Sequence, residues 1–333
     1  MHRLADQWLM IALFVATAAV PSLGSAADAG PAAWSQWRGP SRDAFVPAPA
    51  WPGTLAGEAL KQLWRVELGP SYSGPVASDS VVFTTATDEQ KWEVVRAFEG
   101  STGKKLWETR WEGAMQVPFF AASHGNWIRA TPALSDDRLY VAGMRDVLVC
   151  LDARTGQEIW KVDFPADRKT PLPAFGFASS PLVLGEHVYV QAGAALTKLN
   201  KATGEVVWQS LRDDGGMYGS AFSSPAFTKL CGIEQLVVQT RTHLAGVAPD
   251  DGRELWSQEI PAFRGMNILT PTVLDDTIFT SSYGGKSLLL RVEKTDTGFA
   301  VREAWNQRSQ GYMSTPVIID GHAYLHLRNQ RFT

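Results

Sequence analysis

One ten-residue phrase recurs along this 333-residue chain, and it limits the possible folds more than any other feature. In each copy an apolar run leads into a polar turn, and a Trp follows the Gly of that turn by four residues. The full copies are 98–107, 151–160, 199–208 and 247–256. A fifth copy has three extra residues between Gly298 and Trp305, and Trp64 preserves only the end of the phrase. Spacings of 43, 53, 48, 48 and 49 residues between these Trp positions predict a repeat architecture.

Each copy has the chemistry of a tight hairpin. In the second copy the apolar run 147–151 predicts a strand, and Asp152 can accept hydrogen bonds from the amides of the turn. Gly156 supplies the positive φ that such a turn needs, and 158–162 returns as the next strand. The repeat residues to which we assign a structural role are Gly103, Trp107, Gly156, Trp160, Gly204, Trp208, Gly252, Trp256 and Trp305.

A second phrase, with a Pro preceded by small residues, lies between the Trp units. Its six prolines are Pro75, Pro132, Pro181, Pro225, Pro271 and Pro316. Each is followed by a polar turn and an alternating strand such as 138–141 or 187–190. Proline cannot donate a hydrogen bond to a neighbouring strand, so it is confined to sheet edges. The phrase therefore marks an edge strand in every repeat.

One repeat is thus four antiparallel strands in about 45 residues, without a helical pattern, which is typical of a propeller blade. We predict an all-β fold, a β-propeller in which the Pro strands line a central channel and the Trp side chains pack between blades. About six blades are represented: five whole ones and half of a sixth, which the strand of Trp64 is predicted to complete. A WD40 propeller is disfavoured because no Trp is followed by Asp.

The pattern Asp-x-x-Thr-Gly-x-x-x-Trp, with Ser-Ser-Pro opening the next unit, resembles the tryptophan-docking repeat of pyrroloquinoline-quinone (PQQ)-type propellers. The resemblance covers residues 60 to 333. It implies seven or eight blades in a full-length protein, so we expect this chain to be truncated at its C-terminus; a six-bladed ring that lacks one strand is the alternative. The superfamily contains quinoprotein dehydrogenases as well as non-catalytic members, such as the scaffold lipoprotein of the outer-membrane β-barrel assembly machinery.

The N-terminus has the layout of a secretory signal peptide over residues 1–26. Arg3 precedes the apolar run 8–16, and small residues follow at 24–27. A permanent membrane span is the alternative, but the run is short and Pro21 ends it. No Cys lies near the cleavage site for a lipid anchor. We therefore expect a periplasmic or secreted protein with no stable membrane span after cleavage.

Residues 27–60 form a Pro-, Ala- and Gly-rich arm ahead of the propeller, which we assign to 61–333. The arm contains Trp34-Ser-Gln-Trp37-Arg-Gly-Pro, which resembles an opening segment seen ahead of many bacterial propellers of this type. We expect it to pack over the propeller with both Trp side chains in an apolar groove. A partner-binding segment is the alternative.

Composition excludes several classes of function. A net charge of −3 and a pI of about 6.1 leave no general basic surface for nucleic acid. Only Cys150 and Cys231 are present, and we expect them to be unpaired. His322 and His326 share one face of a strand, but zinc needs three or four protein ligands, so no metal site is expected.

Candidate binding residues gather where the loops before each Pro strand meet the loops between second and third strands, at one mouth of the channel. Aromatic side chains mixed with Arg and Asn at a concave mouth suit a polar ligand or a peptide. In the alternative, these residues only seal the channel. The candidates are Asn126, Trp127, Arg129, Arg145, Arg241, His243, Asn267, Tyr283, Tyr312 and Arg328, and the aromatic stretches around Phe175 and Phe222 reach the same mouth.

These observations favour an exported, non-catalytic propeller that acts as a binding or scaffold module for a protein, peptide or glycan in the cell envelope. The alternative is a PQQ- and Ca²⁺-dependent quinoprotein dehydrogenase. Alcohol-oxidising members of that class carry two adjacent Cys beside the cofactor, whereas Cys150 and Cys231 are 81 residues apart. No catalytic residue is assigned, and a cofactor is expected only under the alternative. An extracytoplasmic part of a larger sensor assembly is also compatible with the sequence.

Overall fold

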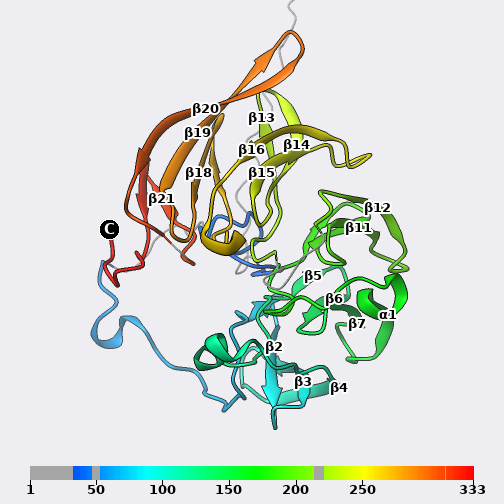
Figure 1. Cartoon of the computed structure of the whole chain (residues 1–333). Helices are drawn as coiled ribbons and strands as arrows, with labels where there is room; N and C mark the ends of the chain where they lie inside the picture. Colours follow the sequence, from blue (N-terminus) through cyan, green and yellow to red (C-terminus); the bar gives the residue numbers. More distant parts are fainter. Residues whose placement is uncertain (1–32, 47–52, 214–220, 312) are drawn as a thin grey trace, which may run out of the picture. The chain divides into compact units, whose positions relative to one another are not determined.

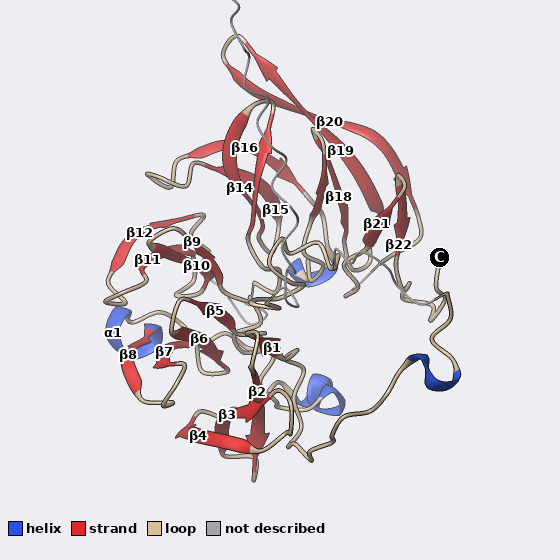
Figure 2. Ribbon diagram, turned by 180° about the vertical axis from the view of Figure 1, so that it is seen from behind, coloured by secondary structure: helices blue, strands red, loops and turns tan. Residues whose placement is uncertain are grey.

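Strands make up most of the regular structure in the computed structural model, which describes residues 33–46, 53–213, 221–311 and 313–333. These residues lie in one compact unit, Ala32–Thr333. The expected signal peptide falls outside the described residues. The helical elements of the described part are α1 (Phe164–Arg168) and the 3-10 turns η1 (Gly57–Ala59), η2 (Phe119–His124) and η4 (Phe263–Gly265), all of them short (Figure 2). Within those ranges, no helix has the length and apolar character needed to cross a bilayer.

The described strands form antiparallel sheets that follow one another along the chain (Figure 1). The first sheet contains β1 (Val76–Ala77), β2 (Val81–Asp88), β3 (Trp92–Glu99) and β4 (Lys105–Glu112). The second contains β5 (Ala133–Ser135), β6 (Arg138–Gly143), β7 (Val147–Asp152) and β8 (Glu158–Asp163). The third contains β9 (Leu182–Leu184), β10 (His187–Gln191), β11 (Leu196–Asn200) and β12 (Val206–Ser210).

The fourth sheet contains β13 (Ala226–Leu230), β14 (Ile233–Gln239), β15 (His243–Val247) and β16 (Glu254–Glu259). The fifth contains β17 (Thr272–Leu274), β18 (Thr277–Ser281), β19 (Ser287–Thr295) and β20 (Gly298–Gln307). The sixth pairs β21 (Val317–Ile319) with β22 (His322–Tyr324). Each sheet corresponds to one sequence repeat, and its first strand follows the repeat's Pro. The predicted all-β propeller class is confirmed.

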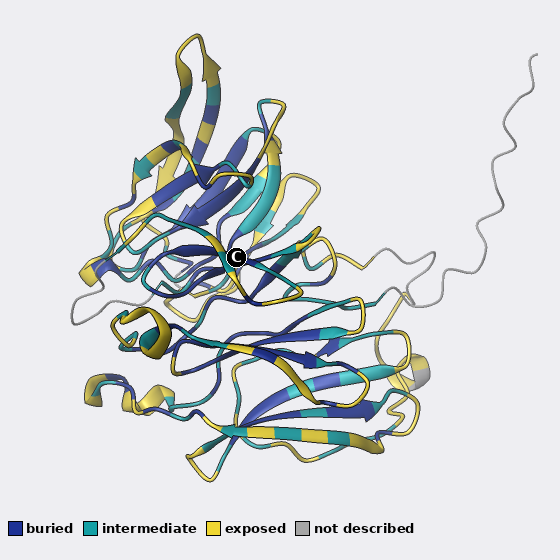
Figure 3. Ribbon diagram, turned by 90° about the vertical axis from the view of Figure 1, so that its right-hand side faces the viewer, coloured by how far each residue is buried: buried dark blue, intermediate teal, exposed yellow. Residues whose placement is uncertain are grey.

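Burial changes across each sheet in step with the position of the strand (Figure 3). Five of the six residues of β7 are buried, because a third strand is covered on both faces by neighbouring sheets. In β4, a fourth strand, exposed residues alternate with half-buried ones because only one face meets a neighbour. This gradient explains why β7 reads as a continuous apolar run while β4 carries charged residues at positions 105, 108, 110 and 112.

The hydrophobic core is divided among the interfaces between consecutive sheets. Phe83 and Val95 of the first sheet pack with Leu139 and Val149 of the second. Similar clusters join the second sheet to the third, the third to the fourth and the fourth to the fifth. Each sheet therefore depends on its neighbours in the chain for burial, as a propeller requires.

In each of the first three sheets, the repeat Trp rests on the Gly turn of the next sheet. The ring of Trp107 lies so close to Gly156 that a Cβ there would come within 2.5 Å of it. Its indole N–H donates to the Ala153 carbonyl at 3.0 Å. Trp160 contacts Gly204 in the same way and donates to the Lys201 carbonyl at 3.1 Å.

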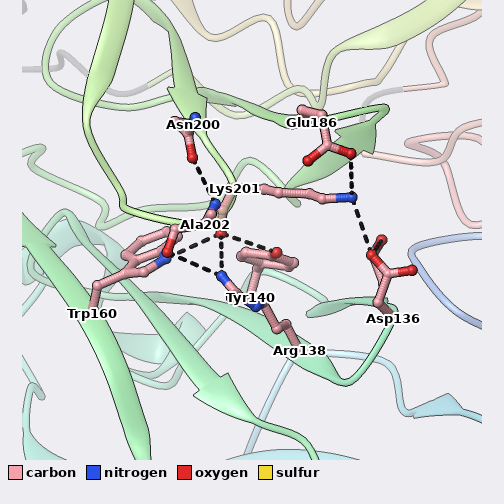
Figure 4. A network of polar contacts seen from close by, with 9 residues as sticks. Asp136, Arg138, Tyr140, Trp160, Glu186, Asn200, Lys201 and Ala202 are labelled. Atoms are coloured by element: carbon pink, nitrogen blue, oxygen red, sulfur yellow. Dashed lines mark hydrogen bonds and ion pairs between the residues drawn. The ribbon is translucent and has the colours of Figure 1, made fainter.

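Figure 4 shows the environment of that carbonyl. Arg138 and Tyr140 of the second sheet also donate to the Lys201 oxygen, at 3.1 and 3.2 Å. The Lys201 side chain pairs with Asp136 of the second sheet at 3.1 Å and with Glu186 of its own sheet at 3.2 Å. One turn of the third sheet is therefore held from several positions of the second.

The structure differs from the expectation for Trp64. Its segment belongs to none of the described strands and does not complete the sixth sheet, where β22 pairs only with β21. Trp64 lies instead against Gly103 of the first sheet and donates to the Gly100 carbonyl at 2.7 Å. The ring of Trp64 therefore packs on the Gly turn of the first sheet, in the same way that the Trp rings of the first three sheets pack on the Gly turns of the sheets that follow them.

Trp256 and Trp305 also depart from the expected packing. Trp256 is buried, yet its indole N–H donates to Gln235 Oε1 of its own sheet at 2.6 Å. A Cβ at Gly298, the next turn glycine, would meet nothing within 4 Å. Trp305 is 41% exposed. The packing of each Trp on the next Gly turn is therefore not uniform along the chain.

Candidate functional site

A belt of hydroxyl groups joins the inner strands. In the first five repeats the residue before the Pro donates its backbone N–H to the hydroxyl at the same position of the next repeat. The bonds are Gly74 to Thr131 (3.0 Å), Thr131 to Ser180 (3.0 Å), Ser180 to Ser224 (2.9 Å), Ser224 to Thr270 (2.9 Å) and Thr270 to Thr315 (3.3 Å). The small residues that mark the Pro phrase are therefore needed for contacts between sheets.

The belt forms part of the wall of a cavity of about 660 Å³, called here the aromatic cavity. Its aromatic side chains come from loops between the sheets, from η2 and from the arm. They are Tyr72, Phe120, Phe175, Phe222, Tyr283 and Trp37. Cavities of this size and mostly apolar lining are typical of ligand sites.

Several of these rings pack against one another. The centroids of Phe120 and Phe175 are 6.2 Å apart, and those of Phe175 and Phe222 are 5.5 Å apart. Next to Phe120, Phe119 is 91% exposed and meets it edge to face at 5.6 Å. The rim of the cavity thus presents accessible aromatic surface that packs against the buried ring of Phe175.

Trp37 lines the cavity and is held by the arm. The guanidinium groups of Arg38 and Arg42 lie 5.5 and 5.2 Å from the centre of its ring. Arg38 donates to the Pro316 carbonyl at 2.6 Å, and Arg42 donates to the Pro181 carbonyl at 3.0 Å. The arm packs on the inner strands, and Trp37 lines the aromatic cavity while two cations lie against its ring.

Arg129, Tyr283 and their neighbours are the candidates that the structure brings to this cavity. Arg129 lies 5.3 Å from the ring of Tyr72 and donates to the carbonyls of Gly125 and Phe175, both at 3.0 Å. Burial lowers the pKa of Arg129 from its ordinary value. Trp127 packs on Tyr72 at 5.4 Å, and Arg328 lies 4.5 Å from the ring of Tyr283.

The other candidates lie outside the cavity wall. Asn126 accepts a hydrogen bond from the Val117 amide at 2.8 Å, and buried Asn267 donates to two backbone carbonyls at 3.0 Å, so both hold loops. Arg241 pairs with Asp213 at 2.6 Å. Arg145 and His243 are exposed, and Tyr312 lies outside the described residues.

Sequence reasoning missed Trp37, Phe120 and the hydroxyl belt as wall residues. Only the belt has a signal that could have revealed it. The residue before the Pro is Ser or Thr in five of the six repeats, although one hydroxyl in each sheet does not by itself reveal its partner. The contribution of Trp37 depends on where the arm runs, which has no periodicity to follow.

The cavity wall does not fit a bound calcium ion. Calcium in proteins takes six to eight oxygen ligands, with carboxylates prominent among them. The described wall residues include Arg129 and His124 but neither Asp nor Glu. Across the described ranges, no group of three or more His, Cys, Asp or Glu side chains could hold a metal ion. The donor set required by a calcium-dependent quinone is therefore missing from the described part of this wall.

Two buried carboxyl groups link consecutive sheets. Glu93 accepts hydrogen bonds from the Met144 amide at 2.6 Å and from the Trp111 indole at 2.8 Å. Asp146 accepts one from the Gly193 amide at 2.9 Å. Burial is the main cause that raises the pKa of each group to about 7.

Comparison with known proteins places the chain among relatives of one assembly factor. Residues 91–333 match the family described as outer membrane protein assembly factor BamB. The BamB of Yersinia pestis is 21% identical over 296 residues, which cover 86% of this chain and 67% of that protein. The quinohemoprotein alcohol dehydrogenase ADH IIB of Pseudomonas putida is 25% identical over 142 residues, 40% of this chain and only 19% of the enzyme.

Solved structures agree on the fold. Quinohemoprotein alcohol dehydrogenase ADHIIG from Pseudomonas putida superposes with a TM-score of 0.51 at 16% identity, over 82% of this chain and 48% of the enzyme. The computationally designed Ika8 protein gives a TM-score of 0.52 at 10% identity, over 78% of this chain and 69% of Ika8. At such identities the likeness concerns the fold alone.

Proposed function

This chain belongs to the outer membrane protein assembly factor BamB family, and we propose that it is an exported, non-catalytic scaffold that binds protein partners in the cell envelope. The observation that carries the proposal is the aromatic cavity with its accessible rim. Relatives with the name of an assembly factor support a role in outer-membrane protein assembly.

The rim has the composition of a protein-binding surface. Phe119 is 91% exposed, Tyr72 51% and Phe120 45%, and Arg129 lies beside them. Aromatic and Arg side chains are enriched where binding energy is concentrated, and large exposed apolar patches mark interaction sites. Since Phe120 already packs on Phe175 and Tyr72 on Trp127, little ordering is needed when a partner binds.

A PQQ- and Ca²⁺-dependent dehydrogenase is the second candidate, and the similarity to the Pseudomonas putida enzyme favours it. The cofactor would supply the redox chemistry if it were bound. The described cavity wall argues against this candidate, because its ionisable groups include Arg129 and His124 but no carboxylate. We therefore derive no catalytic step.

The scaffold role is tested by photo-crosslinking in living cells. A benzophenone amino acid replaces Phe119 at the rim in one variant and Val207, a 50% exposed residue of β12, in a matched control. We expect light-dependent crosslinks from position 119 to a protein of the outer-membrane assembly machinery, and none to that protein from position 207. Absence of a rim-specific crosslink would remove the support for this function.

Calorimetric titration with PQQ, with and without Ca²⁺, separates the two candidates. The scaffold proposal expects no binding at high micromolar cofactor. Tight binding that requires calcium would favour the dehydrogenase and direct attention to carboxylates outside the cavity wall.

A further inference from the structure

A second cavity of about 370 Å³ lies beside the arm and is called here the arm groove. Trp37 lines both this groove and the aromatic cavity. The remaining walls come from Gln36 and residues 40–43 of the arm, from the inner strands β9, β13 and β17, and from Thr270, Pro271 and Thr315. The groove is therefore continuous with the interface that the arm makes with the inner strands.

The arm shows how these inner strands bind an extended chain. The amide of Ala77 in β1 donates to the Trp34 carbonyl at 2.9 Å, and that of Leu134 in β5 donates to the Ser35 carbonyl at 2.7 Å. Both donors stand two residues after the Pro of their repeat. Consecutive carbonyls of the arm are thus bound by consecutive sheets.

The groove offers the same backbone donors from three further sheets. Val183, Phe227 and Val273 also stand two residues after their Pro, and all three line the groove. They pair with Val188, Leu236 and Ile278, the register in which Leu134 pairs with Leu139. In an antiparallel pair, alternate residues point their N–H away from the partner strand. The described arm residues 33–46 accept hydrogen bonds from none of these three amides.

The charge beside the groove is mainly positive. Arg38 and Arg42 both lie against Trp37, and the Nε of each is buried without a hydrogen-bond partner. Asp43 is the acidic residue among the groove-lining side chains, and its Oδ1 already accepts the Phe45 amide at 2.8 Å. An incoming acidic side chain would therefore find cations close by.

We infer that the arm groove is a second peptide-binding site, which takes an extended acidic segment of a partner protein along the inner strands β9, β13 and β17. The segment continues the pattern of the arm: its carbonyls accept from Val183, Phe227 and Val273, and its acidic side chain lies near Arg42. Main-chain bonds of this kind supply affinity in β-strand addition, while side-chain pockets supply selectivity. The site is separate from the aromatic rim, so a negative result at the arm groove would not contradict the proposed function.

Hydrogen exchange of the full chain tests this site with a defined probe. The probe is a blocked peptide that alternates Val or Thr with Glu, and its matched control has Lys in place of Glu. At saturating acidic peptide we expect at least tenfold slower exchange at Val183, Phe227 and Val273, with Ile318 unchanged. Ile318 has the same repeat position in β21 but does not line the groove. Unchanged exchange at the three amides, or equal binding of both peptides, would overturn the inference.

A pair of proline variants tests the donors directly. Val273→Pro removes one groove N–H, and Ile318→Pro is its matched control; edge strands tolerate such changes when the N–H faces outward. Loss of one hydrogen bond should weaken acidic-peptide binding about tenfold in Val273→Pro and leave it unchanged in Ile318→Pro. Equal affinity of the two variants would contradict the site. If Val273→Pro does not fold, Thr228→Trp, which fills the groove, should abolish binding.

Discussion

Two kinds of interface between consecutive sheets contain the same Trp motif but use different contacts. One kind joins the first four sheets, and the other joins the fourth sheet to the fifth. Trp107, Trp160 and Trp208 each reach across to a Gly turn of the next sheet and donate to a backbone carbonyl there. Trp256 is equally part of its repeat, yet it donates to a side chain of its own sheet. A recurring motif therefore specifies a Trp at this position without specifying its partner or how deeply it is buried.

Two local differences explain the change. Trp256 lies opposite Gly246, where Trp107, Trp160 and Trp208 lie opposite Ala97, Cys150 and Lys198. Without a side chain at Gly246, the indole can fold over its own sheet and reach Gln235. The three extra residues after Gly298 lengthen β19 and β20 and carry the turn away from Trp256.

The interface between the fourth and fifth sheets uses other contacts. The Cys231 amide donates to Asp276 at 2.6 Å, and its thiol lies 3.2 Å from the Val292 carbonyl. Leu230, Ile278 and Val292 pack around Trp256 in the core of this interface. Cys231 is thus a contact residue, and both cysteines are free thiols.

The largest expected effect concerns a Trp that packs on the Gly turn of the next sheet. Trp160→Ala should lower the free energy of unfolding by about 3–5 kcal/mol, because it leaves a cavity between two sheets and removes the bond to the Lys201 carbonyl. Trp305→Ala should cost about 1 kcal/mol or less, since that ring is 41% exposed. Urea unfolding of both variants measures the difference. Equal losses in the free energy of unfolding would contradict the distinction between a Trp that packs on the next Gly turn and one that does not.

Two glycine substitutions test the same Trp–Gly contact by changing the glycine. Gly156→Ala should cost about 3 kcal/mol, because φ is +74° and the new Cβ would press on the Trp107 ring. Gly232→Ala has a similar φ of +77° but open space around it, so only the backbone strain of about 1 kcal/mol remains. Thermal unfolding compares the two. Similar losses of stability would mean that the substitution at Gly156 costs only the strain of its positive φ, with no added cost from the Trp107 contact.

The pH dependence of stability should distinguish the same regions. Glu93 joins the first and second sheets with its pKa raised to about 7, and its stabilising contribution is therefore complete below the ordinary pKa and lost as pH rises through 7. Between pH 5 and 8 we expect the free energy of unfolding to fall by about 2–3 kcal/mol from this group. Glu93→Gln should flatten the profile by that amount in urea titrations at both pH values.

The matched control for this effect is Gln239, which has a neutral side chain and bonds to Thr280 across the interface between the fourth and fifth sheets. Gln239→Leu should lower stability equally at both pH values. A profile that Glu93→Gln leaves unchanged would show that another group causes the pH dependence.

The smallest effect is expected at the acceptor of Trp256. Gln235→Leu removes the oxygen that binds the buried indole N–H and should cost about 1–2 kcal/mol. This test is possible only in the fourth sheet, because the acceptors of Trp107, Trp160 and Trp208 are backbone carbonyls. Calorimetric melting measures the change, and a neutral result would mean that the indole finds another acceptor in the variant.

Much of the candidate site could not be predicted from the sequence, and particular residues show why. The stretches around Phe175 and Phe222 were expected at a channel mouth because loops before the Pro strands converge in any propeller. Arg145 and His243 occupy equally suitable loops, but the structure leaves them exposed outside the cavity. Trp37 lines the aromatic cavity, but the repeat pattern gives no sign of the two guanidinium groups that the arm brings to its ring. Loop direction and side-chain rotation decide these outcomes, and neither follows from repeat position.

The sequence by itself determined the repeat, the hairpin turns and the edge position of the Pro strands, because each of these depends on residues close together in the chain. Gly156 must adopt a positive φ, and Pro181 cannot hydrogen-bond to strands on both of its sides, whatever residues surround them. Only the tertiary structure decided that Trp64 seats on the first sheet, that Trp256 turns onto Gln235, and that hydroxyls from Thr131 to Thr315 bind successive inner strands. Those contacts join residues of different repeats, so their partners depend on the distance and side chains of the neighbouring sheet.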